Sequence, residues 1–78
     1  MYGYETLTAK QIRVLRLLAY GKKVDKISQL INITPATVRT HINVINNKLG
    51  ASSKVQAMVI YWLNNMEELK NVNIEEIV

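Results

Sequence analysis

The sequence predicts an all-α fold of four helices in one domain, and three observations predict it. Apolar residues recur at steps of three and four along most of the chain, which is the period of a helix with one buried face. Two segments begin with the spacing of a capping box, Thr-x-x-Gln at Thr8 and Ser-x-x-Gln at Ser53. A third segment begins with Thr34 and Pro35 and ends at Gly50, residue types that favour helix starts and stops.

The first helix is expected at about residues 9–20. Thr8 can accept a hydrogen bond from the first turn, and Gln11 can reach back to the Thr8 amide. Gly21 favours the left-handed conformation that ends a helix. The apolar stripe between these signals comprises Ile12, Leu15, Leu18 and Ala19.

The second helix is expected from about Val24 to Ile31. Its start is weakly specified, because Lys23 occupies the cap position and a lysine is a poor cap beside the positive end of a helix. Asn32 tolerates the left-handed conformation that a tight turn to the next helix needs. The residues expected to face inward are Ile27, Leu30 and Ile31, and those expected to face outward are Asp25, Lys26, Ser28 and Gln29.

The third helix is expected at about 35–49. Thr34 can cap its first free amides, and Pro35 fits the first position, where no backbone N–H is needed. Its apolar stripe comprises Val38, Ile42, Ile45 and Leu49. The opposite surface of the first two turns carries a cationic fork, a hydroxyl and an amide, from Arg39, Thr40 and Asn43. These groups suit the edges of DNA bases, so the segment is typical of a recognition helix.

The fourth helix is expected at about 54–65, after the Ser53 cap. It is apolar nearly all round, through Val55, Ala57, Met58, Val59, Ile60, Tyr61, Trp62 and Leu63. A helix that is hydrophobic on two faces generally has two packing partners. Trp62 could be simple core, but the excess of apolar surface favours a homodimer. The residues expected at its interface are Val55, Val59 and Trp62.

The formal charge is unevenly distributed along the chain. The 78 residues carry +4 in total, but residues 1–66 alone carry +7, from nine basic and two acidic groups, and residues 67–78 carry −3. We therefore expect a basic domain, 1–66, followed by an acidic C-terminal tail, 67–78. The pattern leaves the structure of the tail open: it could continue as a helix through Leu69 or be extended.

A basic body suits a polyanion, with an acidic membrane surface as the competing partner. The chain offers no membrane anchor, because its longest apolar run, residues 57–63, is far too short to span a bilayer. It contains no cysteine, which excludes disulfides and thiolate metal sites and fits a reducing compartment. We expect a soluble cytoplasmic protein without membrane association.

No catalytic or metal-binding constellation can be assembled from these residues. His41 is the only histidine, and neither a cysteine nor a carboxylate stands at ligand spacing from it. The chain also lacks a nucleophile–base pair, a paired carboxylate site and a glycine-rich phosphate loop. The sequence therefore predicts neither a cofactor nor an enzyme.

The second and third helices, joined across residues 32–34, make a helix-turn-helix. The surrounding residues that match a family pattern are Leu7, Thr8, Val14, Leu15, Gly21, Ile27, Ile31, Ile33, Thr34, Pro35, Thr37, Val38, Arg39, His41, Ile45, Lys48, Leu49, Gly50 and Ala57. This pattern, over about residues 7–62, resembles the LuxR-type (GerE or NarL-type) DNA-binding domain of bacterial transcription regulators. The resemblance implies a four-helix bundle in which the third helix enters the major groove and the fourth pairs two subunits.

Four positions depart from the family pattern. Gln11 stands where the family commonly has Glu, Asn32 where it has Gly, and Lys54 where it has Arg, and these three keep the needed chemistry. Lys23 replaces a Ser or Thr, which weakens the second helix or adds a phosphate contact. The receiver or ligand-binding domain that usually precedes the family's module is not in this sequence, so the controlling signal is left open.

The candidate DNA-binding residues fall into two groups. Those expected to contact bases are Arg39, Thr40 and Asn43. Those expected to contact phosphates are Thr34, Thr37, His41, Lys48, Lys54, Lys22 and Lys23. The competing interpretations are a capping role for Thr34, a buttress role for His41 and ordinary solvated side chains for Lys22, Lys23 and Lys54.

The sequence thus favours sequence-specific binding of double-stranded DNA and transcriptional regulation. One alternative is a sigma region-four-like module, whose helix-turn-helix is similar. The other is a protein-interaction module on the same fold that binds a partner regulator or RNA polymerase. Neither the operator nor the direction of regulation can be predicted from these residues.

Overall fold

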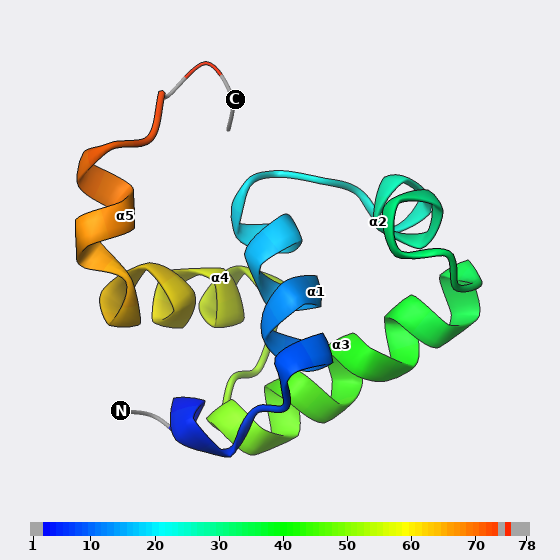
Figure 1. The fold of residues 1–78 in the computed structure, drawn as a ribbon. Helices are drawn as coiled ribbons and strands as arrows, with labels where there is room; N and C mark the ends of the chain where they lie inside the picture. The colour runs from blue at the N-terminus through cyan, green and yellow to red at the C-terminus, as the bar shows by residue number, and fades with distance from the viewer. Residues whose placement is uncertain (1–2, 74, 76–78) are drawn as a thin grey trace.

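The computed structural model describes residues 3–73 and 75, and every regular element in this part of the chain is a helix. The elements are η1 (Tyr4–Thr6), α1 (Ala9–Ala19), α2 (Val24–Ile31), α3 (Pro35–Leu49), α4 (Lys54–Asn64) and α5 (Met66–Lys70) (Figure 1). The predicted all-α class is confirmed. The four predicted helices correspond to α1–α4, and each of their ends lies within one residue of its predicted position.

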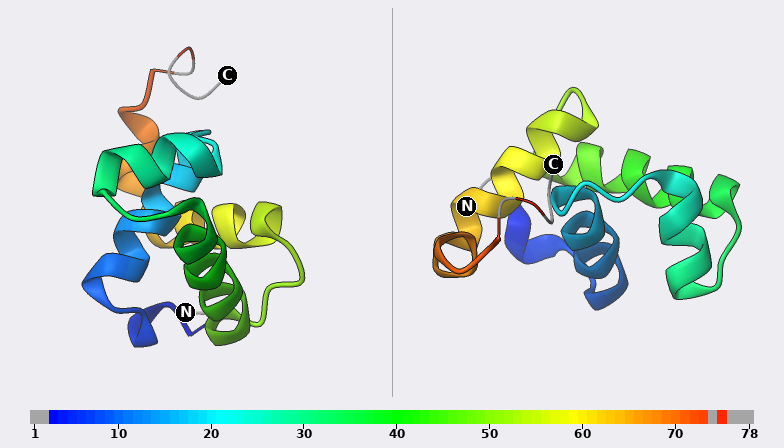
Figure 2. Two further views of the ribbon diagram at one scale, coloured as in Figure 1. Left: turned by 90° about the vertical axis from the view of Figure 1, so that its right-hand side faces the viewer. Right: turned by 90° about the horizontal axis from the view of Figure 1, so that it is seen from above.

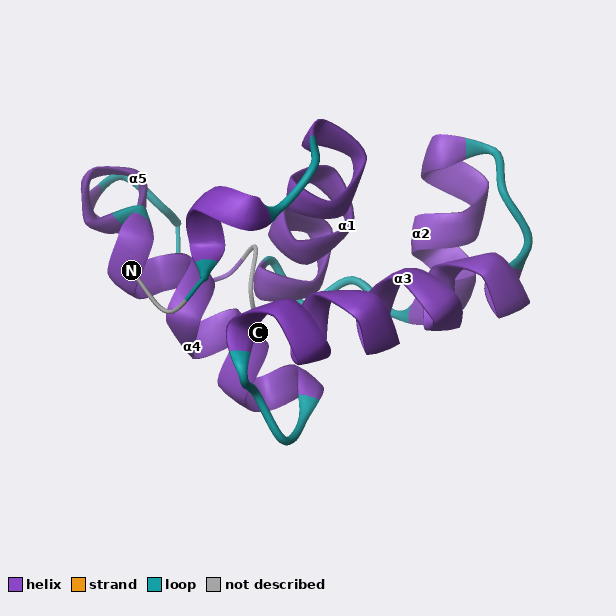
Figure 3. Cartoon of the chain, turned by 90° about the horizontal axis from the view of Figure 1, so that it is seen from below, coloured by secondary structure: helices purple, strands orange, loops and turns teal. Residues whose placement is uncertain are grey.

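α1 lies at the centre of the fold and packs against α2, α3 and α4 (Figure 1). α3 also packs against α2 and α4. Seen from below, α3 runs along the molecule with α2 beside one end and α4 beside the other (Figure 3). The views in Figure 2 show that α5 lies on the far side of α1 from α2 and α3. α3 therefore has one face in the bundle and one face free.

The core forms mainly from the apolar stripes of α1–α4. Ile27 and Val38 are fully buried, and so are Val14 and Leu15 of α1. In α3 the predicted stripe is confirmed, since Val38, Ile45 and Leu49 are buried and Ile42 is half-buried. The buried apolar residues are Leu7, Val14, Leu15, Leu18, Ala19, Ile27, Val38, Ile45, Leu49, Ala57 and Tyr61.

The predicted capping of α1 is confirmed in full. The Thr8 hydroxyl accepts from the Gln11 amide at 3.2 Å, and Gln11 Oε1 accepts from the Thr8 amide at 3.0 Å. Two such bonds satisfy donors that a helix start would otherwise leave unpaired.

The capping box predicted at the start of α4 is only half formed. Ser53 Oγ accepts from the Gln56 amide at 3.3 Å, as expected. Gln56 Oε1, however, accepts from the amide of Ser52 at 2.8 Å instead of that of Ser53. Ser53 is fully extended, with φ −156° and ψ 163°, and the amide within reach of Gln56 is the preceding one. The Ser53 and Gln56 side chains therefore still cap the helix, but the bond to Gln56 Oε1 comes from the amide one residue earlier.

The turns around α2 and α3 have the predicted backbone conformations. Asn32 ends α2 with φ 58°, and Gly50 ends α3 with φ 66°, both in the left-handed region. Thr34 Oγ1 accepts from the Thr37 amide at 3.2 Å and caps α3. Lys23 stands at the cap of α2 without a side-chain hydrogen bond to the helix, as its residue type predicts.

Two facing assignments in α2 were wrong. Leu30, predicted inward, is 45% exposed, and Ser28, predicted outward, is buried. The Ser28 hydroxyl donates to the carbonyl of Asp25 at 2.7 Å, which satisfies it inside the fold. The physical reason is the rotation of α2 about its own axis. Its buried face is centred between Ile27 and Ile31 and extends toward Ser28, so Leu30 lies on the opposite flank.

α5 follows α4 after Asn65 and spans the predicted boundary between the basic domain and the acidic tail. Of the two possibilities for the start of the tail, the described residues adopt the helical one as far as Lys70. Positions 74 and 76–78 lie outside the described residues.

Asn46, on the flank of α3, contains a buried oxygen without a partner. Among the described residues, its Oδ1 atom has no hydrogen-bond partner. An unsatisfied buried carbonyl costs about 1–3 kcal/mol, and leucine has nearly the same size without the polar atoms. We therefore expect Asn46→Leu to raise the free energy of unfolding by about 1–3 kcal/mol, measured by thermal unfolding. The exposed neighbour Asn47→Leu is the control, and a lower melting temperature for Asn46→Leu would contradict the prediction.

Candidate nucleic-acid interface

The predicted base-reading residues lie together on the free face of α3. Arg39, Thr40 and Asn43 are all exposed, whereas Val38 and Ile45 on the same helix are fully buried. This division places the three polar side chains on the side of α3 that faces away from α1. The helix is held by its apolar stripe, and its polar arc is available to a partner.

The polar groups of this arc differ in the hydrogen-bond donors and acceptors that they leave free. Among the described residues, neither the Arg39 guanidinium nor the Asn43 amide has a hydrogen-bond partner, so both keep their donors free. The Thr40 hydroxyl donates to the carbonyl of Ala36 at 3.1 Å. Its oxygen is therefore left as an acceptor, which suits an amino group on cytosine or adenine.

Asn47 is a residue of this arc that the sequence interpretation missed. It is exposed and stands four residues beyond Asn43, one helical turn further along the same face. The spacing from Asn43 was the signal that could have identified it.

The start of α3 combines a cap with a site suited to an anion. Thr34 Oγ1 accepts from the Thr37 amide and shares a second hydrogen bond, 2.9 Å long, with Thr37 Oγ1. Both side chains are exposed at the positive end of the helix dipole. Capping and a phosphate contact are therefore compatible at Thr34.

Three predicted phosphate-contacting lysines come together from two parts of the chain. Lys22 and Lys23, after α1, and Lys54, at the start of α4, line the same hollow in the surface. The other residues that line it are Leu18, Gly21, Val55 and Met58. All three lysines are exposed, so the hollow concentrates positive charge at the surface.

Lys48 and His41 lie apart from the exposed arc. The Lys48 ammonium donates to the carbonyl of Thr6 at 3.1 Å and to Gln11 Oε1 at 2.9 Å. These bonds tie the end of α3 to η1 and to the start of α1, and leave one of three N–H donors free. His41 is half-buried and precedes Lys48 by two helical turns, on the same flank.

α4 presents an exposed apolar stripe on its outer side. Val55 is 61% exposed, Val59 is 53% exposed, and Leu63 continues the stripe one turn later. The stripe borders a groove between α4 and the end of α3, lined by Leu49, Gly50, Val55, Gln56, Val59, Ile60 and Leu63. Contiguous exposed apolar side chains of this kind make the outer side of α4 a candidate interaction surface.

Trp62 lies at the flank of this stripe, where α4 meets α1. Its indole N–H donates to the carbonyl of Ala19 at 3.3 Å. Its ring centroid is 5.3 Å from that of Tyr20 and 5.1 Å from that of Tyr61. The structure therefore brings Val55 and Val59 together and holds Trp62 partly against α1.

Residues 5–61 match the family described as bacterial regulatory proteins, luxR family. The match covers most of the chain, including the whole helix-turn-helix. The chain belongs to this family. Membership implies DNA binding and transcriptional regulation, and the LuxR-type domain is not catalytic.

Curated relatives agree with the LuxR assignment. The chain is 38% identical over 63 residues to the transcriptional regulatory protein LiaR of Bacillus subtilis. It is 33% identical over 63 residues to the response regulator protein VraR of Staphylococcus aureus and of Staphylococcus saprophyticus. The aligned segment is 81% of this chain but 30% of LiaR or VraR, so the chain spans about a third of the length of these relatives. No solved structure matches it.

In the part of the chain that the structure describes, no helix has both the length and the apolar character needed to cross a membrane. Within the same residues, no three His, Cys, Asp or Glu side chains gather closely enough to hold a metal ion.

Proposed function

We propose that the chain recognises a specific duplex DNA sequence by placing α3 in the major groove, and thereby regulates transcription in the bacterial cytoplasm, where its DNA target lies. The observation that carries this proposal is the free polar arc of α3. Arg39 would bond guanine O6 and N7 together, Asn43 would bond adenine, and Thr40 would accept from a base amino group. Residues 1–66 would be the DNA-binding unit.

Phosphate contacts would supply most of the affinity and fix the register of α3. We assign them to two clusters, the hydroxyls at the start of α3 and the lysines of the shared hollow. These residues are Thr34, Thr37, Lys22, Lys23 and Lys54. Lys48 would add a phosphate contact through its remaining donor while it holds α3 in place, and His41 would support the same flank.

Selection of bound sequences from a random duplex pool tests this proposal. Recovery of a short enriched motif is the expected result. If no sequence is enriched at any salt concentration, the proposal fails. The module would then be one for protein interaction, with RNA polymerase or a partner regulator on its apolar surface.

We also propose that two copies pair through α4. Val55 and Val59 supply an exposed apolar stripe beside a groove, and a second copy of the same stripe is a complementary occupant. Trp62 would lie at the edge of this interface and fix α4 against α1. A two-fold dimer prefers an inverted repeat with half-sites one helical turn apart, roughly 10 base pairs centre to centre.

Val59→Glu should weaken the dimer by about a hundredfold or more, because it buries a carboxylate without a partner at the interface. Sedimentation velocity of the free protein and of its complex with an inverted repeat measures the change. Leu30→Glu is the matched control, since it puts the same charge on an exposed leucine of another helix. A wild-type chain that stays monomeric on a saturated inverted repeat would contradict the pairing and leave the stripe to another protein.

A further inference from the structure

α5 is attached to the bundle in an unusual way. It lies outside the segment that matches the LuxR family, and none of its residues is buried. Met66 is 55% exposed and Leu69 is 43% exposed, and the pair formed by Glu67 and Lys70 is at the surface. Apolar burial therefore contributes little to holding this helix in place.

The main attachment is the carboxylate of Glu68. Tyr61 donates its hydroxyl to the two carboxylate oxygens at 2.7 and 3.1 Å. Tyr20 donates to Oε2 at 3.1 Å, and Arg16 Nε donates to the same oxygen at 3.1 Å. Arg16 is in α1, Tyr20 is the residue that ends α1, and Tyr61 is in α4, so one side chain connects α5 to both helices.

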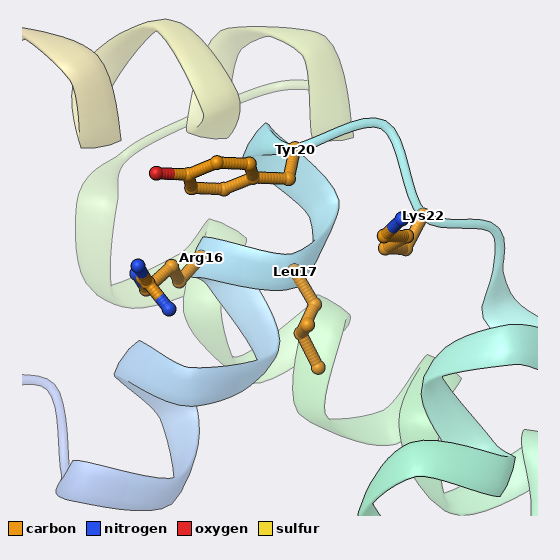
Figure 4. A pocket seen from close by; sticks show the side chains of 4 residues that line it. All are labelled: Arg16, Leu17, Tyr20 and Lys22. Atoms are coloured by element: carbon orange, nitrogen blue, oxygen red, sulfur yellow. The ribbon is translucent and has the colours of Figure 1, made fainter. Parts of the chain in front are cut away.

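The donors are already aligned by contacts among themselves. The Arg16 guanidinium lies over the Tyr20 ring, 5.0 Å from its centroid, and Figure 4 shows the guanidinium and the hydroxyl on the same side of α1. The Tyr20 and Tyr61 rings both pack against Trp62. The cluster therefore forms a preorganised cradle for a carboxylate, defined by Arg16, Tyr20 and Tyr61.

The protonation states suit this arrangement. Burial alone would raise the pKa of Glu68, but the hydrogen bonds from Tyr61, Arg16 and Tyr20 outweigh it and hold the pKa below the ordinary 4.5. Burial raises the pKa of Tyr61 and that of Tyr20, with the Glu68 carboxylate adding to both shifts. At neutral pH a charged acceptor therefore meets two neutral hydroxyl donors and one cation.

We propose that Arg16, Tyr20 and Tyr61 form a carboxylate-binding site, and that Glu68 occupies it to fasten α5 as a strap that opens as a unit while the four-helix bundle stays folded. A five-residue helix does not persist in water by itself, so α5 depends on its attachment. Outside the cradle, Asn65 connects α4 to α5. Its side-chain amide donates to the Tyr61 carbonyl at 2.7 Å and to the Tyr4 hydroxyl at 3.2 Å. The free arc of α3 takes no part in these contacts.

Hydrogen exchange of Glu68→Gln in the full chain tests the strap. The amides to follow are those of Leu69, Asn71 and Val72, which donate to backbone carbonyls of residues 65–69. Loss of a charged acceptor should increase their exchange rates about ten- to a hundredfold. Amides in the middle of α3 should exchange as in the wild type. Glu67→Gln is the matched control, because the Glu67 side chain is 90% exposed and pairs only with Lys70 among the described residues.

Tyr61→Phe provides a second variant that keeps the ring and removes only the hydroxyl donor. It should increase the exchange rates of the same three amides.

Lowering the pH should remove the difference in exchange rate between the wild type and Glu68→Gln. A carboxylate with a lowered folded pKa contributes its full stability above pH 4.5 and loses it as the pH falls through the folded value. Equal acceleration by Glu67→Gln, or α3 amides that accelerate together with those of α5, would overturn the proposal. The DNA affinity of Glu68→Gln is measured separately and tests the recognition helix independently of the strap.

Discussion

Ile45→Ala is expected to lower the free energy of unfolding by about 2–5 kcal/mol, a large share of the total stability of so small a domain. Ile45 is fully buried in α3, the helix that packs against α1, α2 and α4. Truncation to alanine removes apolar contacts and leaves a cavity among these helices. Urea or thermal unfolding followed by circular dichroism measures the loss.

Asn47→Ala, on the exposed side of the same helix, is the control and should change stability by only about 0.5 kcal/mol. If Ile45→Ala left the unfolding midpoint unchanged, α3 would have to be rotated about its axis relative to the structure described above. The assignment of Arg39 to the DNA-facing arc would then fail as well, because both assignments depend on the same rotation.

Arg39→Ala is expected to weaken binding to the best DNA site by about 1–3 kcal/mol and to relax the preference at one base pair. The guanidinium has no partner among the described residues, so its donors are free to form a bidentate bond with guanine. Titrations of the selected site, of variants at each position and of random duplex measure both effects.

Lys54→Ala is the companion variant for that experiment. Its side chain lies in a hollow shared with Lys22 and Lys23, which suits a phosphate. It should weaken binding to all duplexes alike and reduce the slope of log affinity against log salt by about 1. Equal losses on specific and random DNA for Arg39→Ala would instead make Arg39 a phosphate contact.

Local signals allowed most of the fold to be predicted from the sequence. The caps at Thr8 and Thr34 and the left-handed terminator Gly50 each act within a few residues, so they mark helix ends reliably. Long apolar stripes likewise fixed the inward face of α3. α2 has only eight residues, and its few apolar positions left its rotation ambiguous, which explains the errors at Leu30 and Ser28.

Contacts between distant parts of the chain could not be predicted in this way. Helical periodicity says which face a side chain occupies but not which other helix it meets. The bond from Lys48 to Gln11 joins residues 37 positions apart, and that from Arg16 to Glu68 joins residues 52 positions apart. Lys48 therefore looked like a simple phosphate contact. The attachment of α5 through Glu68 could not be predicted, because the sequence characterised the tail only by its charge.

The anchoring of α3 at both ends has a thermodynamic consequence. Thr34 caps its start, and Lys48 ties its end to η1 and α1, so the helix is ordered before DNA arrives. Little conformational entropy then remains to be lost when the helix docks. The heat-capacity change of association would reflect the water released from two preformed surfaces, and would lack the large negative term of a segment that folds as it binds.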